Sequence, residues 1–407
     1  MKCILLAVDD RPFKGIKNAP YTLNTMGLPL FAQGISAIQN AGYDVECVMA
    51  TSIQEQLSKL DSKIANSYQA SVYSQETKWL DAYGSNVVIL LDAAVYYLGN
   101  GLIHGFKTRS LSVGKEPVVY RVGDRPVALI ARADMLKSVW NKAKPDVTKR
   151  RFMTQLVLAM QEQQISSYED TLRMDEAVVV DQLYAHHLIV DFLRDEKLKQ
   201  LMGNGVQILD RHSTFIDSTV QIEEGTIVYP GCVLEGLTSI GSDCEIGPGA
   251  RIANSKIGSN VVVKDSTLTD ASVDDHTAIG PYAYLRPKSD IGKHVKIGDF
   301  VEVKNARIDD YSKVSHLSYI GDGSVGKNVN VGCGVVFVNY DGKNKHLTTI
   351  EDNAFIGCNA NLVAPVTVKR GAYVAAGSTI TEDVEVESLA IARCRQTQKL
   401  NWVKNKK

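Results

Sequence analysis

An aliphatic side chain returns at every sixth position through most of the second half of the chain. A helix repeats at 3.6 residues and a strand at two, so neither element alone produces this spacing. A strict period of six is typical of a parallel β-helix, in which each unit is one short strand and a turn, and three units close one triangular coil. The recurring residues form three runs: Ile222, Val228, Leu234, Ile240, Ile246 and Ile252; Ile279, Leu285, Ile291, Ile297 and Val303; and Ile350, Ile356, Leu362, Val368, Val374 and Ile380.

Glycine often follows the recurring aliphatic residue. Glycine is favoured where the chain turns sharply or where two backbones approach closely. The interior of such a coil is packed and dry, so we expect its chemistry on the outer faces, on loops that interrupt the period, or between subunits. The glycines at this position include Gly241, Gly247, Gly292, Gly298 and Gly357.

The first half of the chain has a different pattern. Short apolar runs at 3–8, 45–50 and 87–91 predict buried strands, and helical periodicity over 28–41 ends at Gly42. Strands that alternate with helices are typical of an α/β layer with a mainly parallel sheet. We therefore expect an α/β domain here.

Two further elements complete this half. Apolar residues on both sides of Gly123-Asp124, between about 114 and 135, predict a β-hairpin. A long helix is expected over 181–202, followed by Gly203-Asn204-Gly205. The expected organisation is thus an α/β domain over 1–180, a connecting helix over 181–205, and a β-helix with a C-terminal tail over 206–407.

The composition narrows the class of function. Of the 407 residues 44% are hydrophobic, and a formal charge of −1 provides no basic field that would favour nucleic acid. The seven cysteines lack paired metal-type spacing, and their odd number disfavours a disulfide framework. We see no leader pattern and no apolar run of about 20 residues, so we expect a cytoplasmic protein without a membrane span.

Several motifs of the second half occur in the order and spacing of a known enzyme family. From about Gly205 to the end, the chain resembles the acetyltransferase half of the bifunctional bacterial enzymes that make UDP-N-acetylglucosamine. Those enzymes pair a glucosamine-1-phosphate N-acetyltransferase with an N-acetylglucosamine-1-phosphate uridyltransferase. The motifs are Gly280-Pro-Tyr-Ala-Tyr-Leu-Arg-Pro287, Phe300-Val-Glu-Val-Lys304, His316-Leu-Ser-Tyr-Ile-Gly-Asp322, Asn330-Val-Gly-Cys-Gly334, Asn339-Tyr-Asp-Gly-Lys-Asn-Lys345, Leu362-Val-Ala-Pro-Val366 and Arg393-Cys-Arg-Gln-Thr-Gln-Lys399.

The resemblance implies transfer of an acetyl group from acetyl-CoA to the amine of an amino-sugar phosphate. This reaction needs a neutral amine, a base that accepts its proton, and donors for the developing oxyanion. His316 is the candidate base, because an imidazole, with an ordinary pKa of about 6.5, is suited to proton transfer near neutral pH. We expect direct attack of the amine on acetyl-CoA, and only structural roles for His276, His294 and His346.

The resemblance also implies the residues that bind the two substrates. Some of them lie where the six-residue register breaks, between Phe337 and Ile350, and excursions of this kind are commonly functional. The residues expected at the sugar phosphate are Arg286, Lys304, Tyr319, Asn330 and Lys345. Those expected at acetyl-CoA, the co-substrate, are Asn339, Tyr340, Cys333, Cys358, Ala376 and Arg393, with Arg393 near the phosphates of the coenzyme.

Two of these positions differ from the family pattern. Cys333 replaces a small residue, and Cys358 replaces a serine that helps to bind the coenzyme. A thiol near a thioester raises the alternative of a ping-pong mechanism, whereas a buried cysteine more often behaves as a small hydrophobic residue. We expect the second role, and the exchanges leave the affinity for acetyl-CoA open.

The first half departs from the same family at its phosphate-binding loop. A uridyltransferase of this family continues from its first strand into Leu-Ala-Ala-Gly-x-Gly-Thr-Arg-Met, whose glycines let backbone N–H groups approach phosphate. Here the strand continues into Val8-Asp9-Asp10-Arg11-Pro12, and two carboxylates repel a triphosphate unless metal ions intervene. Asp92 resembles the metal-binding aspartate of the family, but Asp181-Gln182 replaces its usual Asn-Asn partner. We expect a degenerate nucleotidyltransferase-like domain without that activity, which would use Mg²⁺ only if it were active.

We therefore expect an α/β nucleotidyltransferase-like (Rossmann-like) domain followed by a left-handed parallel β-helix. The expected function is a glucosamine-1-phosphate N-acetyltransferase of UDP-N-acetylglucosamine biosynthesis, with no metal in its acetyltransferase site. By resemblance the protein is a homotrimer whose active sites are shared between subunits. Three alternatives stay open: galactosamine-1-phosphate as the substrate, a bifunctional enzyme with residual uridyltransferase activity, and a non-catalytic assembly protein.

Overall fold

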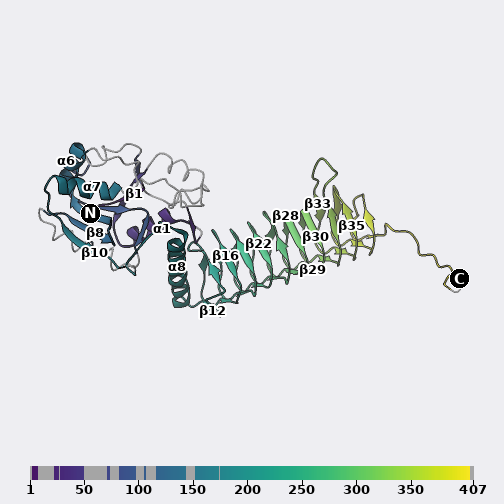
Figure 1. Cartoon of the computed structure of the whole chain (residues 1–407). Coiled ribbons are helices and arrows are strands. Elements are labelled where there is room, and N and C mark those ends of the chain that lie inside the picture. The colour runs from purple at the N-terminus through teal and green to yellow at the C-terminus, as the bar shows by residue number, and fades with distance from the viewer. Residues whose placement is uncertain are drawn as a thin grey trace. The chain divides into compact units, whose positions relative to one another are not determined.

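The computed structural model describes residues 2–7, 23–26, 28–49, 71–73, 82–97, 105–106, 116–143, 152–173 and 175–403. The chain divides into two compact units, Met1–Asp195 and Glu196–Lys407 (Figure 1). The boundary between them lies inside helix α8 (Leu183–Gly203). Among the described residues, no helix is long and apolar enough to cross a membrane.

The first unit is built on a seven-stranded mixed sheet in the order β10-β8-β9-β6-β1-β4-β5. Strand β9 is antiparallel to both of its neighbours, and the other pairs are parallel. The hairpin predicted around Gly123-Asp124 explains the direction of β9 relative to β8, because a two-residue turn joins only antiparallel strands. The strands are β1 (Lys2–Ala7), β4 (Asp44–Met49), β5 (Ser71–Tyr73), β6 (Val87–Asp92), β8 (Val118–Val122), β9 (Arg125–Arg132) and β10 (Tyr168–Thr171).

Helices cover both faces of this sheet. Leu5 of β1 packs in one core with Ile35 of α1 (Leu30–Asn40). Leu6, the next residue, packs in a second core with Leu136 of α6 (Ala133–Ala143) and Leu156 of α7 (Phe152–Glu162). Successive side chains of a strand point to opposite faces, so a strand buried on both sides is apolar throughout. This arrangement confirms the α/β layer.

Two short ribbons flank the sheet. In the first, Leu28 and Pro29 pair with a preceding strand, so α1 begins at Leu30 and not at residue 28 as expected. The strands of the ribbons are β2 (Asn24–Thr25) with β3 (Leu28–Pro29), and β7 (Val95–Tyr97) with β11 (Ala177–Val179).

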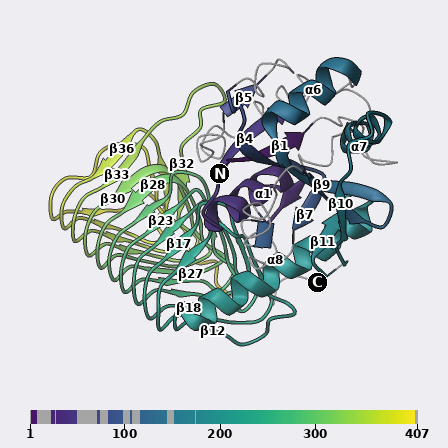
Figure 2. The ribbon, with the colours of Figure 1, turned by 90° about the vertical axis from the view of Figure 1, so that its left-hand side faces the viewer.

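The second unit is a left-handed parallel β-helix with three faces, and its coils stack along one axis (Figure 2). The first face is an eleven-stranded sheet. Its strands are β12 (Gln207–Ile208), β15 (Ile227–Val228), β18 (Glu245–Ile246), β21 (Val262–Val263), β24 (Ala278–Ile279), β27 (Lys296–Asp299), β29 (Lys313–His316), β31 (Asn330–Val331), β34 (Phe355–Ile356), β37 (Tyr373–Val374) and β39 (Leu389–Ala390).

The other two faces form one continuous sheet of seventeen strands, because β28 (Glu302–Ile308) and β30 (Tyr319–Val325) run through both. The second face further contains β13 (Phe215–Ile216), β16 (Val233–Glu235), β19 (Arg251–Ala253), β22 (Thr267–Thr269), β25 (Tyr284–Leu285), β32 (Val336–Val338), β35 (Asn361–Val363) and β38 (Thr379–Ile380). The third face further contains β14 (Gln221–Ile222), β17 (Ser239–Ile240), β20 (Lys256–Ile257), β23 (Ser272–Val273), β26 (Asp290–Ile291), β33 (Thr348–Ile350) and β36 (Val366–Val368).

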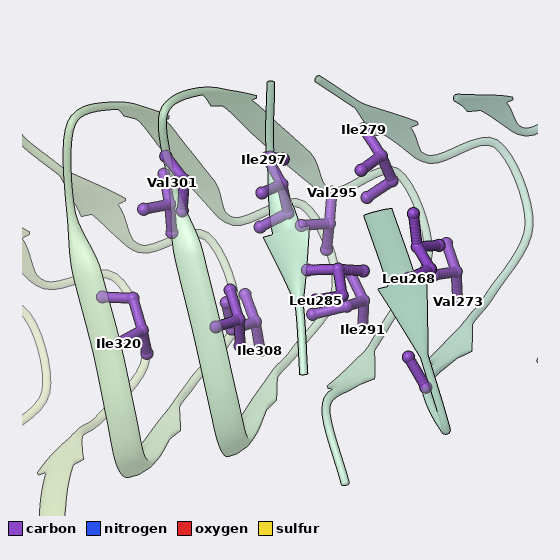
Figure 3. Packing of buried hydrophobic residues seen from close by; sticks show 14 of the residues in the cluster. Leu268, Val273, Ile279, Leu285, Ile291, Val295, Ile297, Val301, Ile308 and Ile320 are labelled. Atoms are coloured by element: carbon purple, nitrogen blue, oxygen red, sulfur yellow. The ribbon is translucent and has the colours of Figure 1, made fainter. Parts of the chain in front are cut away.

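The interior of the coil is the predicted aliphatic stack, shown in Figure 3 for a middle section. Every residue of the three predicted runs is buried. The stack also continues without a break through the apparent gaps between the runs, where Leu268 is followed by Val273 after only five positions. Where a corner is one residue shorter, the spacing between interior residues drops from six to five, but the aliphatic side chain still points into the coil.

Two backbone features form the corners. A residue with positive φ recurs there, for example Asn305 at 45° and Asp322 at 48°, and both residue types tolerate this conformation. The glycines that follow the anchors allow close approach of successive coils. A Cβ atom on Gly298 would lie 1.9 Å from the Ser315 carbonyl oxygen.

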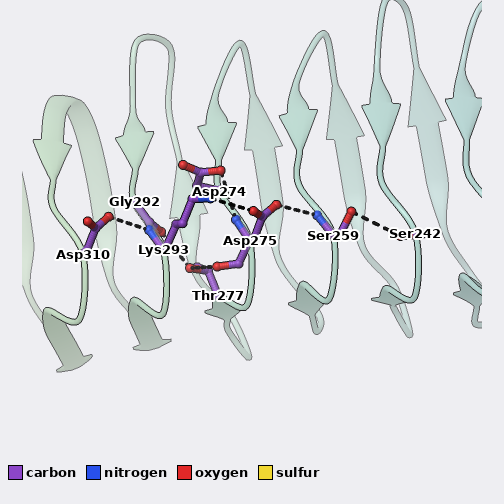
Figure 4. A network of polar contacts seen from close by, with 8 residues as sticks. All are labelled: Ser242, Ser259, Asp274, Asp275, Thr277, Gly292, Lys293 and Asp310. Carbon is purple, nitrogen blue, oxygen red and sulfur yellow. Dashed lines mark hydrogen bonds and ion pairs between the residues drawn. The ribbon is translucent and has the colours of Figure 1, made fainter.

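Alternating charges link successive coils at one of these corners, shown in Figure 4. We call it the third corner, and its members in successive coils are Asp275, Lys293 and Asp310, which Figure 4 shows, and then Lys327. The Lys293 ammonium donates to Asp275 at 2.9 Å, and the backbone N–H of Lys293 donates to Asp310 at 3.0 Å. Lys327 repeats the pattern by donating its ammonium to Asp310 at 3.0 Å. Each carboxylate therefore joins the coil before it to the coil after it.

The C-terminal turns of α8 close the first coil. Leu198 and Leu201 belong to the hydrophobic core of the β-helix. The Lys197 ammonium donates to the backbone carbonyls of Ser218 and Val220, at 3.1 and 2.6 Å. The helix end therefore covers apolar surface that would otherwise be open to water.

Candidate active site

His316 lies at the turn that leads from the first face to the second. It ends β29, which pairs in parallel with β27, and Asp299 is its partner across the two strands. The Asp299 carboxylate contacts Nδ1 of His316. This hydrogen bond holds the pKa of the Asp299 carboxyl below its usual value. A titratable ring with a fixed partner is thus exposed at the surface.

The same position in later coils carries residues expected at acetyl-CoA. Four interior residues of the first face are in register: Val314, Val331, Ile356 and Val374. The residue two positions after each of them therefore belongs to one column along the coil. Near the C-terminal end of this column, the aliphatic part of the Arg393 side chain lies beside Gly377. We call this column the first corner, and its members are Asp299, His316, Cys333, Cys358 and Ala376. Cys358 and Ala376 are exposed and Cys333 is half-buried.

A second column lies where the second face meets the third, and its members are Asn305, Asp322 and Asn339. We call it the second corner. Asp322 is only 8% exposed, and its carboxylate accepts hydrogen bonds from the side-chain amides of Asn305, at 2.7 Å, and of Asn339. Partial burial raises the pKa of the Asp322 carboxyl, but these hydrogen bonds and the charges of Lys345 and Lys304 lower it below its usual value. A buried carboxylate thus ties three coils together beneath two lysines.

Those two lysines form a cationic pair at the second corner. Lys304 is part of β28, whereas Lys345 lies in the excursion between β32 and β33. The close approach of Lys304 and its positive charge lower the pKa of Lys345. Two ammonium groups held this close favour an anion between them.

Arg286 and Tyr319 lie on the second face between these two corners. The Arg286 guanidinium donates to Glu302 at 2.7 Å, and this bond raises the pKa of Arg286. A Cβ atom on Gly321 would lie 2.4 Å from the Tyr319 hydroxyl. The missing side chain therefore lets the Tyr319 ring extend along the strand, and this ring lies near Arg286 and Lys345.

The excursion itself is a small ordered loop that protrudes beside β33 (Figure 1). The Asp341 carboxylate accepts hydrogen bonds from the backbone N–H of Lys343 at 2.8 Å, from that of Asn344 at 2.6 Å, and contacts Nε2 of His346 at 2.7 Å. The bonds from Asn344, His346 and Lys343 hold the pKa of the Asp341 carboxyl far below its usual range. Tyr340 in this loop is 56% exposed.

The structure gathers the expected residues into two groups. Arg286, Lys304, Tyr319 and Lys345 lie on the second face and at its second corner. At the first corner lie His316, Cys333, Cys358 and Ala376, and Arg393 lies beside it at Gly377. Tyr340 and the buried Asn339 lie elsewhere. Asn330 is on the first face, where it pairs with Lys313 and Phe355.

Sequence reasoning missed four polar residues of these groups. They are Asp299, Glu302, Asn305 and Asp322. The signal that could have found three of them is the length of one coil. Asp299 is 17 positions before His316, and Asn305, Asp322 and Asn339 are separated by the same interval.

In the first unit, Asp92 lies at the end of β6 and is held by protein groups. Its carboxylate accepts from Arg125 at 2.7 Å and from the backbone N–H of Ala94 at 2.9 Å. Among the described residues no group of acidic, histidine and cysteine side chains could hold a metal ion. Asp181 and Gln182 are exposed before α8, while Asp9 and Asp10 lie outside the described residues.

Comparison with known proteins extends these observations. The model of the bacterial transferase hexapeptide family, with six repeats, matches residues 347–382. A protein of Clostridioides difficile named Bifunctional protein GlmU is 62% identical over 205 residues, which are 50% of this chain and 45% of that protein. Proteins of the same name from Alkaliphilus metalliredigens and Acetivibrio thermocellus are 51% identical over 243 residues and 59% over 211. The match with the Alkaliphilus protein spans 60% of this chain and 52% of that protein. The match with the Acetivibrio protein spans 52% of this chain and 46% of that protein.

The chain thus spans about half the length of the curated relatives it matches. These matches confirm the resemblance that the motifs of the second half indicated.

Proposed function

We propose that this chain, which resembles the GlmU proteins over about half of its length, is an amino-sugar-1-phosphate N-acetyltransferase that uses acetyl-CoA. One observation carries the proposal. A base with a fixed partner and a cationic pair lie at the two edges of one outward face, with the Tyr319 ring along that face. An amino-sugar phosphate requires a proton acceptor for its amine and cations for its phosphate, and this face offers both.

The second corner is suited to the phosphate. Lys304 and Lys345 bring two positive charges together, and an anion between them relieves their repulsion. Arg286 adds a planar group that can donate two parallel hydrogen bonds to phosphate. Asp322 holds the loop of Lys345 against the coil through Asn339, so the cations are positioned before the substrate arrives.

The first corner is suited to the chemical step. His316 accepts a proton from the amine as the nitrogen attacks the acetyl carbonyl, and the thiolate of coenzyme A then leaves. General-base help of this kind contributes roughly 10²- to 10⁴-fold to a rate. Cys333, Cys358 and Ala376 continue the column from His316, where small side chains leave room for a thioester and its chain.

We further propose that the enzyme is a homotrimer with shared active sites, as the resemblance implies. The natural amino-sugar phosphate is glucosamine-1-phosphate in this proposal, and UDP-N-acetylglucosamine biosynthesis is its pathway. Galactosamine-1-phosphate remains the alternative, because the two sugars differ only in the orientation of one hydroxyl group.

The test is an acetylation assay of the purified chain. Release of the coenzyme A thiol is followed with acetyl-CoA and each of the two amino-sugar phosphates. We expect turnover with glucosamine-1-phosphate and a lower kcat/KM with galactosamine-1-phosphate. A purified trimer that turns over neither sugar would contradict the proposal and support the non-catalytic assembly protein.

We also propose that the α/β half lacks uridyltransferase activity. The Asp92 carboxylate accepts hydrogen bonds from Arg125 and from a backbone N–H group. The segment Val8-Asp9-Asp10-Arg11-Pro12 that follows β1 carries two aspartates and no glycine. The relatives are named as bifunctional proteins, which favours the opposite view. Pyrophosphate release from UTP and N-acetylglucosamine-1-phosphate with Mg²⁺ decides between them, and detectable release would overturn our view.

A further inference from the structure

We propose that Asp299 is a positioning residue for the candidate base: its carboxylate fixes the His316 imidazole so that Nε2 faces the substrate amine. This inference rests on the proposed function and adds a residue that the motifs do not contain. It concerns a single pair of side chains on two neighbouring coils.

The contact determines which nitrogen carries the proton. Asp299 contacts Nδ1 of His316. An ionised carboxylate only accepts hydrogen bonds, so Nδ1 must be the donor. In a neutral imidazole the other nitrogen then holds the free electron pair. Asp299 thus selects the form of the ring in which Nε2 can act as a base.

The backbone holds both residues of the pair in place. Asp299 and His316 are partners across β27 and β29, and the N–H of Leu317 donates to the Asp299 carbonyl at 2.9 Å. Gly298 leaves no room for a side chain against Ser315, so the two coils approach closely just before the pair. The Ser318 hydroxyl donates to the His316 carbonyl at 2.8 Å.

The pair is poorly explained as a device for stability. The side chains of His316 and Asp299 are 53% and 36% exposed, and ion pairs at exposed positions contribute little to folding. The interior aliphatic stack already holds these coils together. A fixed orientation of the ring is the remaining consequence of the contact. Other titratable groups beside the pair are Lys296 and Lys313 on β27 and β29, Tyr319 after the turn, and Cys333 in the next coil.

The test uses the full chain with Asp299→Asn and Asp299→Glu. Asparagine keeps the size of the side chain, but its amide can donate to Nδ1 as well as accept from it, so the ring is no longer fixed. We expect kcat to fall about 10- to 100-fold, with KM for both substrates changed by less than about threefold. Asp299→Glu keeps the carboxylate and should restore part of the rate.

The pH profile separates a positioning role from a general loss of structure. A negative charge beside an imidazole favours its protonated form. Its removal in Asp299→Asn should therefore move the acidic limb of the kcat/KM profile to lower pH. Asp310→Asn at the third corner is the matched control, because it removes a carboxylate that also bridges two coils (Figure 4). We expect that variant to keep the wild-type rate and pH profile.

A second measurement does not depend on turnover. In protein labelled with ¹⁵N-histidine, NMR reports which ring nitrogen is protonated, and His316→Gln assigns the signal. We expect a proton on Nδ1 in the wild type at pH 8 and a mixture in Asp299→Asn. An unchanged tautomer, or an Asp299→Asn variant with the wild-type rate and pH profile, would overturn the inference. If the wild-type chain shows no acetyl transfer but the tautomer changes as expected, the proposed function fails and the positioning contact stands.

Discussion

At the scale of single residues, the chemistry depends on side chains whose neighbours come from other coils. His316 was identified from its motif, and its motif contains no partner for Nδ1. Asp299 supplies that partner from 17 positions earlier, and it lies outside the motif of His316. The motif of His316 therefore indicated the candidate base but not its partner, which only a search for polar residues one coil length apart in the sequence would have found.

The first prediction concerns the base. His316→Ala should lower kcat by about two orders of magnitude or more, because the attacking amine loses its proton acceptor. Acetyl-CoA binding should be nearly intact, since the ring lies at one end of the column expected to hold the coenzyme. Steady-state kinetics together with calorimetric titration of acetyl-CoA would measure both quantities. A variant that keeps most of its rate would show that His316 is not the base.

The second prediction concerns the thiol in the same column. Cys358→Ser should keep kcat within about threefold, because direct attack of the amine requires no covalent acetyl-enzyme. Cys358 is exposed, so the smaller hydroxyl leaves no cavity in the core. The kinetics are compared with those of His316→Ala. A loss as large as that of the histidine variant would return the ping-pong mechanism to consideration.

At the scale of elements, the period of six predicted the coil but not its continuity. The spacing drops to five where a corner is one residue shorter, as between Leu268 and Val273, so the register seemed to stop there. In the first unit β1, β4, β6 and the hairpin of β8 and β9 followed from apolar runs and turn residues, whereas the shorter strands were not predicted. The order of the strands did not follow from these patterns, because pairing in a sheet is set by contacts distant in sequence.

The third prediction concerns the loop between β32 and β33. Asp341→Ala removes the acceptor shared by Lys343, Asn344 and His346, so the loop that carries Tyr340 and Lys345 should lose its fixed form. We expect KM for both substrates to rise about three- to tenfold, while Tm stays nearly constant because the loop lies outside the core. Kinetics and thermal unfolding would measure the two effects.

Asp341→Asn is the matched control for this loop, since its side-chain oxygen still accepts from the two backbone N–H groups. Its KM for both substrates should lie between those of the wild type and of the alanine variant. The depressed pKa of Asp341 gives the sign of the pH dependence: the carboxylate orders the loop above its unfolded pKa of about 4, and this order is lost only as pH falls through the lower folded value. If KM of the wild type rises between pH 7 and 5 and the Asp341→Asn variant lacks this rise, the ordering role of the ionised Asp341 carboxylate is contradicted.

At the scale of the whole molecule, the β-helix has its own core and a cap drawn from α8. Stability in a solenoid comes mainly from neighbouring coils, so a fragment that keeps every coil should fold alone. The cap decides where that fragment must begin. Leu198 and Leu201 cover the first coil, and Lys197 binds its open carbonyls.

The fourth prediction therefore compares two fragments. The fragment 196–407 should be trimeric and should acetylate, whereas 205–407 lacks the cap and should be less stable, with a Tm several degrees lower. Size-exclusion chromatography, thermal unfolding and the thiol-release assay would compare them. A soluble and trimeric 196–407 fragment without activity would show that the α/β half contributes to acetyl transfer.

The parallel register between coils also has a mechanical consequence. The hydrogen bonds that join one coil to the next run along the axis of the stack, so a pull on the two ends of the β-helix loads one coil at a time. Each released coil of 17 or 18 residues adds about 60 Å of extended chain. Val331 pairs with Ile356, 25 positions later, so the coil that carries the loop should add about 80 Å. In a single-molecule stretching record, that longer step would mark the moment at which the candidate site comes apart.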